Sequence, residues 1–504
     1  MPRSAGPKNL CLPAFIAALI CGAAIIAILY IPQPVGLANN GDFLRVIHTT
    51  GIAYADGKPD KDRFAVEYRM KLQGDTAVQK LFSVFELDHE LYEYRTSQSV
   101  FVILSKALNL AWNKLTGAPA ANYSIIWLGM IYISVFLCAL YLILSFVYRR
   151  FGRGMFVFAA LAALLIFCDQ GYLLYFNSFY GEALQYASTF LAIGLYMRLC
   201  EKPERGFPSY LLYYSAVMVM AASKNAYAPV GVLFGLLPLA LWRKLAFQKW
   251  LAVSGAVALT VWGIALVLFL TPAWIEKDTN FDAVFAGILP QSDTPERDLA
   301  KLGLDADLAV LKGHEAYQSE YPIDVFGEDF NARFYDKISK GKILAFYLRN
   351  PGRLWEAVKT AAFWSKAIRP GYLTNYRNPS VPGQQSRRFS LWETARGAIG
   401  VNRLWLILAV FGLTLGVIVS AIIARPRKKA RADAAKAALT ALLAAILASA
   451  AFCFVIPYIS NGVCDIAKHM FGFVALYDAL LVVLAGYAGW SVCNLRDKFN
   501  HSAK

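Results

Sequence analysis

The sequence predicts an all-α polytopic membrane protein with about ten transmembrane helices and two large extracytoplasmic loops. Of its 504 residues 58% are hydrophobic and 17% are charged, against about 45–50% and about 25% in ordinary soluble domains. The apolar residues gather in runs of about 20, the length that crosses a bilayer, and Lys and Arg gather in the short connections between runs. These features exclude a soluble multi-domain enzyme, a disordered chain and a disulfide-rich secreted domain.

The runs that are long enough to span a membrane are residues 10–31, 124–148, 154–172, 180–199, 209–223, 226–242, 250–272, 401–424, 437–457 and 471–493. The first run is longer than the apolar core of a typical signal peptide, so we expect it to stay as a span.

Alternate connections are basic, as in RRFGR (149–153) and RPRKKARADAAK (425–436). Basic connections lie on the cytoplasmic side, so both termini are expected there. The net charge of +16 then reflects membrane orientation, and no nucleic-acid partner is expected.

This topology divides the chain into a first helix (1–31), a first outer loop (32–123), helices 2–7 (124–272), a second outer loop (273–400), and helices 8–10 with a basic tail (401–504). The first loop contains SVFVILSKALNLAWNKL, in which polar residues interrupt the apolar ones. That pattern favours an amphipathic helix at the membrane surface over a further span.

Asp42 is the first candidate for catalysis, because it follows the exit of the first span within NNGDFLRV. A half-buried carboxylate there can act as a general base, with Asn40 and Arg45 placed to bind substrate. The alternative is a structural Asx turn or a helix N-cap.

A second polar group interrupts an apolar hairpin at FNSFYGEA, which contains Asn177, Tyr180 and Glu182. Ionisable groups near a membrane tend to face cavities or partners. We expect Glu182 to line a cavity as a second catalytic candidate, with Asn177 and Tyr180 binding substrate; the alternative is a solvated loop tip.

Basic residues near the outer turns are candidates for binding phosphate. They are Lys224, Arg369, Lys468 and His469. Lys224 could instead extend to lipid headgroups, and Asp465 and His469 could form a structural pair one helical turn apart.

The stretch YEYRTSQSV adds Arg95 and Gln98, which suit sugar hydroxyls. A DxD at Asp305 and Asp307 lies in an amphipathic stretch, and we interpret it as a solvated face. No metal-binding cluster, P-loop, GxSxG or dinucleotide motif is evident, so we expect no cofactor, and metal dependence stays open.

The strings NNGDFLRV, YEYRTSQ, FNSFYGEA, SKNAYAPVG, IRPGYLTNY and DIAKHMFGF resemble the WsfD-type glycan-biosynthesis hexose transferases of the GT-C glycosyltransferase superfamily. The resemblance implies a polyprenyl-phosphate-sugar donor and an acidic catalytic residue in the first outer loop. Asp42 matches that position, and Glu182 is the candidate for a second acidic residue.

Together these observations predict an inverting glycosyltransferase of the bacterial cytoplasmic membrane. It would move a sugar from a polyprenyl-phosphate donor to a glycan or lipid-linked acceptor at the outer face. The alternatives are an O-antigen polymerase or ligase, which would depend on basic loop residues, and a lipid-linked glycan transporter, which would show internal symmetry.

Overall fold

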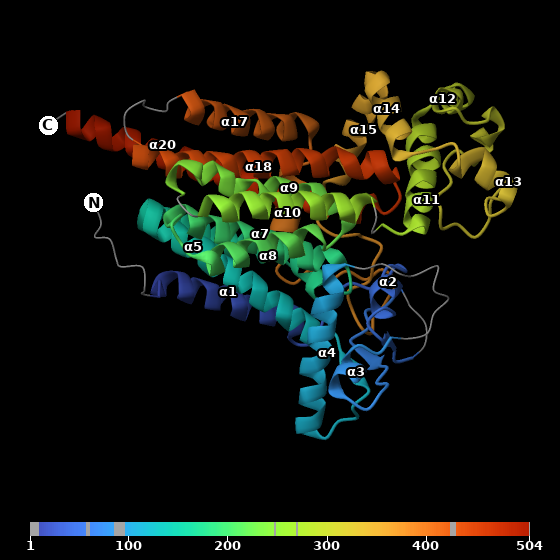
Figure 1. Ribbon diagram of the computed structural model, residues 1–504, viewed down its shortest axis with the longest axis horizontal. Coiled ribbons are helices and arrows are strands. Elements are labelled where there is room, and N and C mark those ends of the chain that lie inside the picture. Colours follow the sequence, from blue (N-terminus) through green and yellow to red (C-terminus); the bar gives the residue numbers. More distant parts are fainter. Residues whose placement is uncertain are drawn as a thin grey trace.

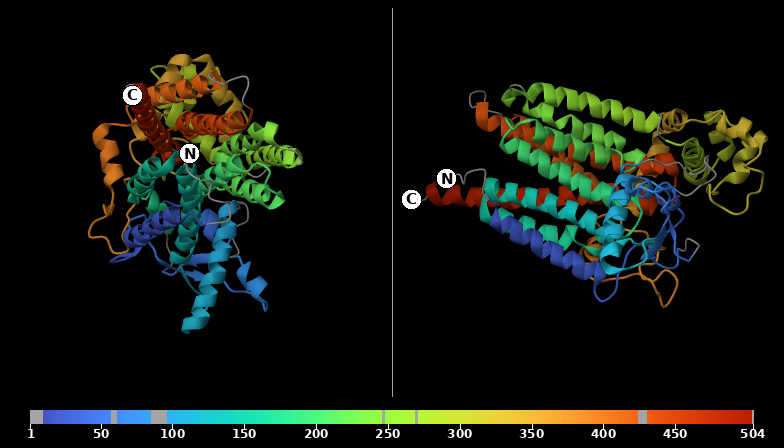
Figure 2. Two further views of the ribbon diagram at one scale, coloured as in Figure 1. Left: turned by 90° about the vertical axis from the view of Figure 1, so that its left-hand side faces the viewer. Right: turned by 60° about the horizontal axis from the view of Figure 1, so that its bottom comes forward.

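The computed structural model describes residues 10–56, 61–84, 96–245, 248–268, 271–423 and 430–502, and it is mostly helical. Long helices run side by side in one bundle, and the shorter elements gather at one end of it (Figure 1). We call this end the loop end. Helix α1 begins and α20 ends at the opposite end (Figure 2).

The bundle is formed by α1 (Leu12–Tyr30), α5 (Ile126–Ala162) with η1 (Ala163–Phe167), α7 (Gly181–Glu201), α8 (Phe207–Ala221), α9 (Ala228–Gly235) with η4 (Leu237–Lys244), α10 (Gln248–Leu268), α17 (Leu404–Ile423), α18 (Ala430–Asn461) and α20 (Phe471–Ser502). Short elements join them at the loop end: α6 (Gln170–Leu173), η2 (Leu174–Asn177), η3 (Asn225–Tyr227) and α19 (Ile466–His469).

Seven helical segments of the described chain are long and apolar enough to cross a membrane. The chain is therefore a multi-pass membrane protein, while the expected count of ten spans stays a prediction. The two numbers differ because polar residues such as Gln185, Ser188 and Thr189 make α7 less apolar, α8 has 15 residues, and one segment of 42 residues is counted once.

That 42-residue segment, residues 126–167, reverses its direction at Gly152. The rings of Phe136 and Phe167 both contact the ring of Phe190, at 5.6 and 4.9 Å. A straight helix would hold Phe136 and Phe167 about 46 Å apart. Gly152 has φ 85° and ψ −175°, which permits the reversal inside the basic RRFGR connection.

The first group at the loop end contains a small sheet, which an all-α prediction missed. Its elements are α2 (Leu44–Ile47), β1 (Ile52–Tyr54), β2 (Glu67–Met70), α3 (Ala77–Leu81), α4 (Ser97–Thr116) and β3 (Asn122–Ser124). The strands are antiparallel in the order β1-β2-β3, and Tyr68 lies opposite Tyr54 and Tyr123. Strands of three or four residues are too short to leave a recognisable alternation in the sequence.

The second group is helical. It comprises α11 (Ala273–Phe281), η5 (Asp282–Ile288), η6 (Leu289–Gln291), α12 (Pro295–Leu302), η7 (Ala306–Leu311), α13 (Glu328–Phe330), η8 (Asn331–Tyr335), α14 (Lys340–Arg349), α15 (Pro351–Trp364) and α16 (Leu391–Ile399).

Polar contacts fix α16 to the bundle. The carboxylate of Asp478 on α20 pairs with the fully buried Arg396 and accepts a hydrogen bond from Trp392 Nε1 at 2.5 Å. Asp169 accepts from the backbone N–H of Trp392 at 2.8 Å and of Gly171 at 2.8 Å, which caps two helix starts at once. The second outer group is thereby held in a set position at the loop end.

Gly152→Ala should destabilise the protein, because a Cβ is strongly disfavoured at that backbone conformation. No other atom lies within 4 Å of the added Cβ, so the loss reports backbone strain and should be about 1–3 kcal/mol, measured by thermal unfolding in detergent.

Gly154→Ala is the matched control, since its site is equally open and helical. It should be neutral or stabilising. Equal effects of the two substitutions would contradict the reversal at Gly152.

Candidate functional site

A tight turn at residues 39–42 presents Asp42 at the loop end. The side-chain oxygen of Asn39 accepts hydrogen bonds from the N–H of Gly41 at 2.8 Å and of Phe43 at 3.1 Å. Gly41 has φ 116°, which favours glycine. Asn39 thus forms the Asx turn, and the carboxylate of Asp42 makes no helix-capping bond.

The Asp42 carboxylate contacts two cations. Lys468 Nζ donates to one oxygen, and Arg45 lies 3.0 Å from the other. Lys468 is 1% exposed and also contacts Asp465 Oδ2 at 2.8 Å. A buried ammonium therefore bridges two carboxylates that are more than 400 residues apart in the chain.

Glu182 and Lys224 form a second ion pair nearby, at 2.7 Å, with Glu182 3% exposed. Lys224 Nζ also lies 3.0 Å from His469 Nδ1, and His469 is next to Lys468. The start of α7 approaches the end of α8 closely, because a Cβ on Gly181 would lie 2.5 Å from the carbonyl oxygen of Ser223. Glycine at this position lets Glu182 reach Lys224.

Tyr180 connects the two ion pairs. Its hydroxyl donates to the carbonyl of Ala38 at 2.9 Å and accepts from the N–H of Asn40 at 3.1 Å. Lys468 Nζ lies 5.2 Å from the centre of its ring. The carbonyl of Tyr180 accepts from Gln98 Nε2 at 3.1 Å.

We call the seven central residues the charge cluster: Asp42, Arg45, Glu182, Lys224, Asp465, Lys468 and His469. Three carboxylates meet three cations there, and the imidazole of His469 contacts Lys224.

Opposite charges keep Asp42 and Lys468 ionised. Burial acts to raise the pKa of Asp42, but Arg45 and Lys468 outweigh it, so the pKa lies well below its usual range. Burial acts to lower the pKa of Lys468, but Asp42 and Asp465 hold it well above its usual range. Both groups are therefore charged at neutral pH.

His469 is neutral. Burial, together with the positive charges of Lys224 and Lys468, holds its pKa well below the usual range. Its Nδ1 can therefore accept a hydrogen bond from the Lys224 ammonium.

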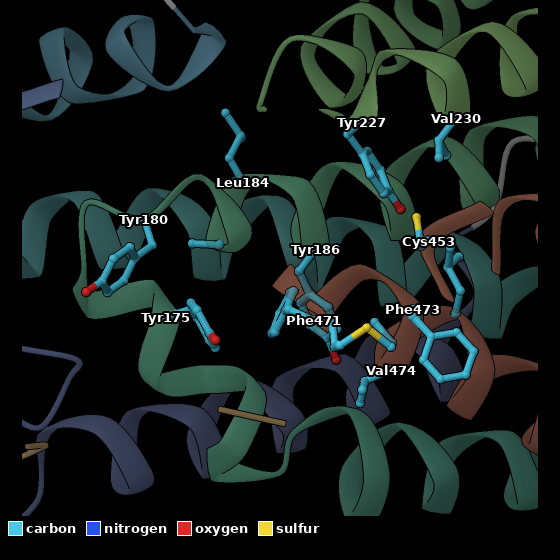
Figure 3. Close-up of a cluster of buried hydrophobic side chains, with 14 of the residues drawn as sticks. Tyr175, Tyr180, Leu184, Tyr186, Tyr227, Val230, Cys453, Phe471, Phe473 and Val474 are labelled. Atoms are coloured by element: carbon cyan, nitrogen blue, oxygen red, sulfur yellow. The ribbon is translucent and has the colours of Figure 1, made fainter. Parts of the chain in front are cut away.

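Buried aromatic side chains pack around Phe471 of α20 (Figure 3). The rings of Tyr175 and Phe471 are 4.4 Å apart, and those of Tyr186 and Phe471 are 5.8 Å apart. A small cavity lies beside them, lined by Gln185, Tyr186, Thr189, Phe190, Ile193, Tyr227, Phe471, Gly472, Ala475, Leu476 and Ala479. The segment that follows Lys468 and His469 is thus held in the apolar core of the bundle.

Arg369, a predicted phosphate ligand, lies outside the charge cluster. Its guanidinium is 4% exposed and pairs with Glu393 at 2.8 Å and with the side-chain oxygen of Asn375 at 2.8 Å. Asn375 in turn accepts from the N–H of Gly36 through its carbonyl at 3.2 Å. Arg369 supports the segment leading to Asp42 and does not face the cluster, which corrects the expected placement.

Asn177 is also used structurally. It is fully buried, accepts from the Tyr30 hydroxyl at 2.9 Å and donates to the carbonyl of Val35 at 2.7 Å. Its expected contact with substrate is therefore not supported by its placement. Arg95 lies outside the described residues.

Asp465 is the member of the cluster that sequence reasoning undervalued. A structural pair with His469 was the alternative that the sequence left open, and in the structure the Asp465 carboxylate accepts from Lys468, from Asn40 Nδ2 at 2.5 Å and from the Tyr372 hydroxyl. Its backbone is left-handed, with φ 49°. The sequence signal for this contact was the spacing of Asp465 and Lys468, which are three residues apart.

Arg45 faces the second outer group as well as Asp42. Its guanidinium lies 4.9 Å from the centre of the Trp274 ring and donates to the Tyr317 hydroxyl at 3.3 Å. That hydroxyl donates to Asp278 at 2.7 Å. Both outer groups therefore border the cluster.

Asp305 and Asp307 do not face the cluster. Both carboxylates contact Arg333 at the surface of the second outer group. Among the residues that the structure describes, no three His, Cys, Asp or Glu side chains come together as a metal site would require.

The chain matches the family model described as "YfdI N-terminal transmembrane domain" over residues 5–503. It belongs to this family. Neither the search of curated proteins nor the search of solved structures finds a match. All seven members of the charge cluster lie within the matched range.

Asp282 lies beside the segment that carries Asp465. It is 1% exposed, accepts from the N–H of Ala316 at 2.7 Å, and burial raises its pKa to about 7. The folded state then holds a proton that the unfolded state loses near pH 4, so the stability falls as the pH rises between these values.

Asp282→Asn should remove this dependence, because the amide does not titrate. The melting temperature of the natural protein should fall relative to that of the variant between about pH 5 and about pH 7. Asp42→Asn is the control: Asp42 is ionised throughout that range in both states, so its effect should not change with pH. A constant difference for Asp282→Asn would contradict the buried, protonated carboxyl.

Proposed function

We propose that the protein is an inverting glycosyltransferase that moves a sugar from a polyprenyl-phosphate donor to a glycan or lipid-linked acceptor. The observation that carries the proposal is the meeting of Asp42 with the buried Lys468 and the half-buried Arg45 at the loop end, near the ion pair of Glu182 and Lys224. A carboxylate base and cations for a phosphate are groups that this reaction needs. The family, which is GT-C-like, supports the same class of chemistry.

In the proposed reaction one proton is transferred, one bond forms and one bond breaks. The acceptor hydroxyl attacks the anomeric carbon and its proton passes to Asp42. The bond between that carbon and the phosphate oxygen breaks, and the electron pair leaves with the polyprenyl phosphate. Attack from the face opposite the leaving group inverts the anomeric centre.

Asp42 is a weak base while Lys468 and Arg45 hold its pKa low. The cluster has balanced charges, so a bound phosphodiester adds a negative charge that shares these cations. The sharing weakens their effect on Asp42 and raises its pKa towards that of an effective general base. Donor binding would thus activate the base.

Lys224, Lys468 and the neutral His469 are placed to bind the phosphate as its negative charge grows. Glu182 holds Lys224 in position at 2.7 Å. Asn40, next to the turn at Asp42, can orient sugar hydroxyls, and Arg45 can bind either sugar or phosphate. Tyr180 and Gln98, which were expected to bind substrate, are buried and bonded within the protein, and they support the positions of Asn40 and Glu182.

We further propose that the protein acts like the WsfD-type hexose transferases. It would lie in the bacterial cytoplasmic membrane, with its active site on the outer face. The basic RRFGR connection at the end opposite the cluster supports that orientation.

Asp42→Asn should lower sugar transfer by about 10²–10⁴-fold, the usual contribution of a general base. The measurement is the release of polyprenyl phosphate from a panel of short-chain polyprenyl-phosphate hexoses in membranes that contain the protein. Asp56→Asn is the matched control, because Asp56 is an exposed partner of Arg63 at 2.6 Å in the same outer segment. Full activity of Asp42→Asn would refute the assignment and favour a polymerase, ligase or transporter.

Lys224→Met should lower the same rate by about 10²–10³-fold, as expected when one preorganised contact to a developing charge is lost. Lys359→Met is the control, since Lys359 pairs with Glu356 on the surface of α15 at 2.7 Å. Unchanged turnover in Lys224→Met would remove this lysine from the phosphate site.

A further inference from the structure

A group of arginines lies at the end of the bundle opposite the loop end, where α7 ends and α8 begins. Arg149 of α5 donates to both carboxylate oxygens of Glu201 at the end of α7, at 2.8 and 3.1 Å. Arg198 lies one turn earlier on α7, and Arg205 follows in the connection to α8. The carboxylate of Glu201 is thus already engaged by Arg149.

Arg205 has an unsatisfied donor. Its Nε–H is buried and has no hydrogen-bond partner among the residues that the structure describes. Burial and the cations of Arg198 and Arg149 lower the pKa of Arg205, and the opposing effect of the nearby carboxylates is smaller. The guanidinium still stays protonated at neutral pH. Because a buried N–H without an acceptor is costly, this position favours an anion that accepts from it.

The connection that carries Arg205 is held by both neighbouring helices. The Tyr210 hydroxyl of α8 donates to the carbonyl of Pro203 at 2.9 Å. Gln248 Nε2, at the start of α10, donates to the carbonyl of Glu204 at 3.1 Å. The turn therefore has its position before a ligand binds, and this lowers the ordering cost of binding.

Exposed apolar side chains lie beside the arginines. Phe207 and Leu211 are one helical turn apart on the same face of α8, and they are 55% and 52% exposed. They begin two residues after Arg205. Trp250, near the start of α10, is 73% exposed, and a tryptophan at the end of an apolar helix is typical of the headgroup region of a bilayer. The cations thus lie at the level of lipid phosphates, next to a surface that acyl chains can cover.

The charge of this region favours an anionic lipid over a zwitterionic one. Segments 149–153 and 198–205 together contain six basic residues and two acidic ones. Basic clusters at the end of membrane helices attract anionic headgroups. A guanidinium is also suited to phosphate, because its donors form a planar fork that can bond two oxygens at once.

We propose that Arg205, together with Arg198 and Arg149, binds the phosphate of an anionic phospholipid in the leaflet at this end of the bundle, and that the acyl chains of the lipid lie along the exposed face of α8. The inference needs the membrane protein alone and does not depend on the proposed reaction. The ion pair of Glu182 and Lys224 lies at the other end of α7 and α8. The bound lipid would therefore hold the two helices that position this pair.

Native mass spectrometry of the delipidated protein in detergent tests the proposal, with phosphatidylglycerol as the anionic probe and phosphatidylcholine as the zwitterionic one. Arg205→Gln should bind phosphatidylglycerol about tenfold more weakly than the natural protein, because a charge-assisted hydrogen bond is lost. Lys436→Gln is the matched control, since it removes an exposed cation near the start of α18, at the same end of the bundle. It should leave the affinity unchanged.

The melting temperature without added lipid separates binding from a structural role. Arg205→Gln should melt no lower than the natural protein, because it removes one of several like charges. A lower value would mean that Arg205 supports the fold and would overturn its assignment as a lipid ligand.

Two further results would overturn the proposal. If Arg205→Gln bound phosphatidylglycerol as tightly as the natural protein does, or if phosphatidylcholine bound equally well, these arginines would not select an anionic lipid. If glycerol 3-phosphate raised the melting temperature as much as phosphatidylglycerol at the same concentration, the ligand would be a soluble phosphate.

Discussion

The buried ammonium of Lys468 is the constraint on which the site depends. An isolated charge at 1% exposure carries a large desolvation cost, so a buried lysine needs opposite charges within contact distance. Asp42 and Asp465 supply them, one from the turn after the first helix and one from the turn before the last. The ion pairs therefore bring together two ends of the chain that share no local structure.

The rest of the loop end is arranged so that these pairs can form. The segment 35–38 is held by the second outer group, where Val35 bridges Tyr376 and Arg369 fixes Asn375. The buried pair of Arg396 and Asp478 holds the same outer group to α20. Such pairs contribute little net stability but become costly when one partner is removed. They fix the positions of connections that would otherwise move at the end of an apolar bundle.

Much of this arrangement could be predicted from the sequence, because apolar length and charge asymmetry are strong signals in membrane proteins. The same logic found Asp42, Glu182, Lys224 and Lys468, since ionisable groups at the ends of spans are costly unless they face partners. It failed for Arg369 and Asn177, because an arginine or asparagine that binds substrate and one that supports a loop have the same local sequence. The contacts of Asp465 could not be predicted, since its backbone is left-handed and the i, i+4 spacing of a regular helix does not apply.

A structure of the protein with a bound polyprenyl-phosphate hexose tests the central claim most directly. The account predicts a phosphate oxygen within hydrogen-bond distance of Lys224 or Lys468, and the Asp42 carboxylate on the face of the anomeric carbon opposite the phosphate. A donor whose sugar lies away from Asp42, or whose phosphate contacts neither lysine, would contradict it.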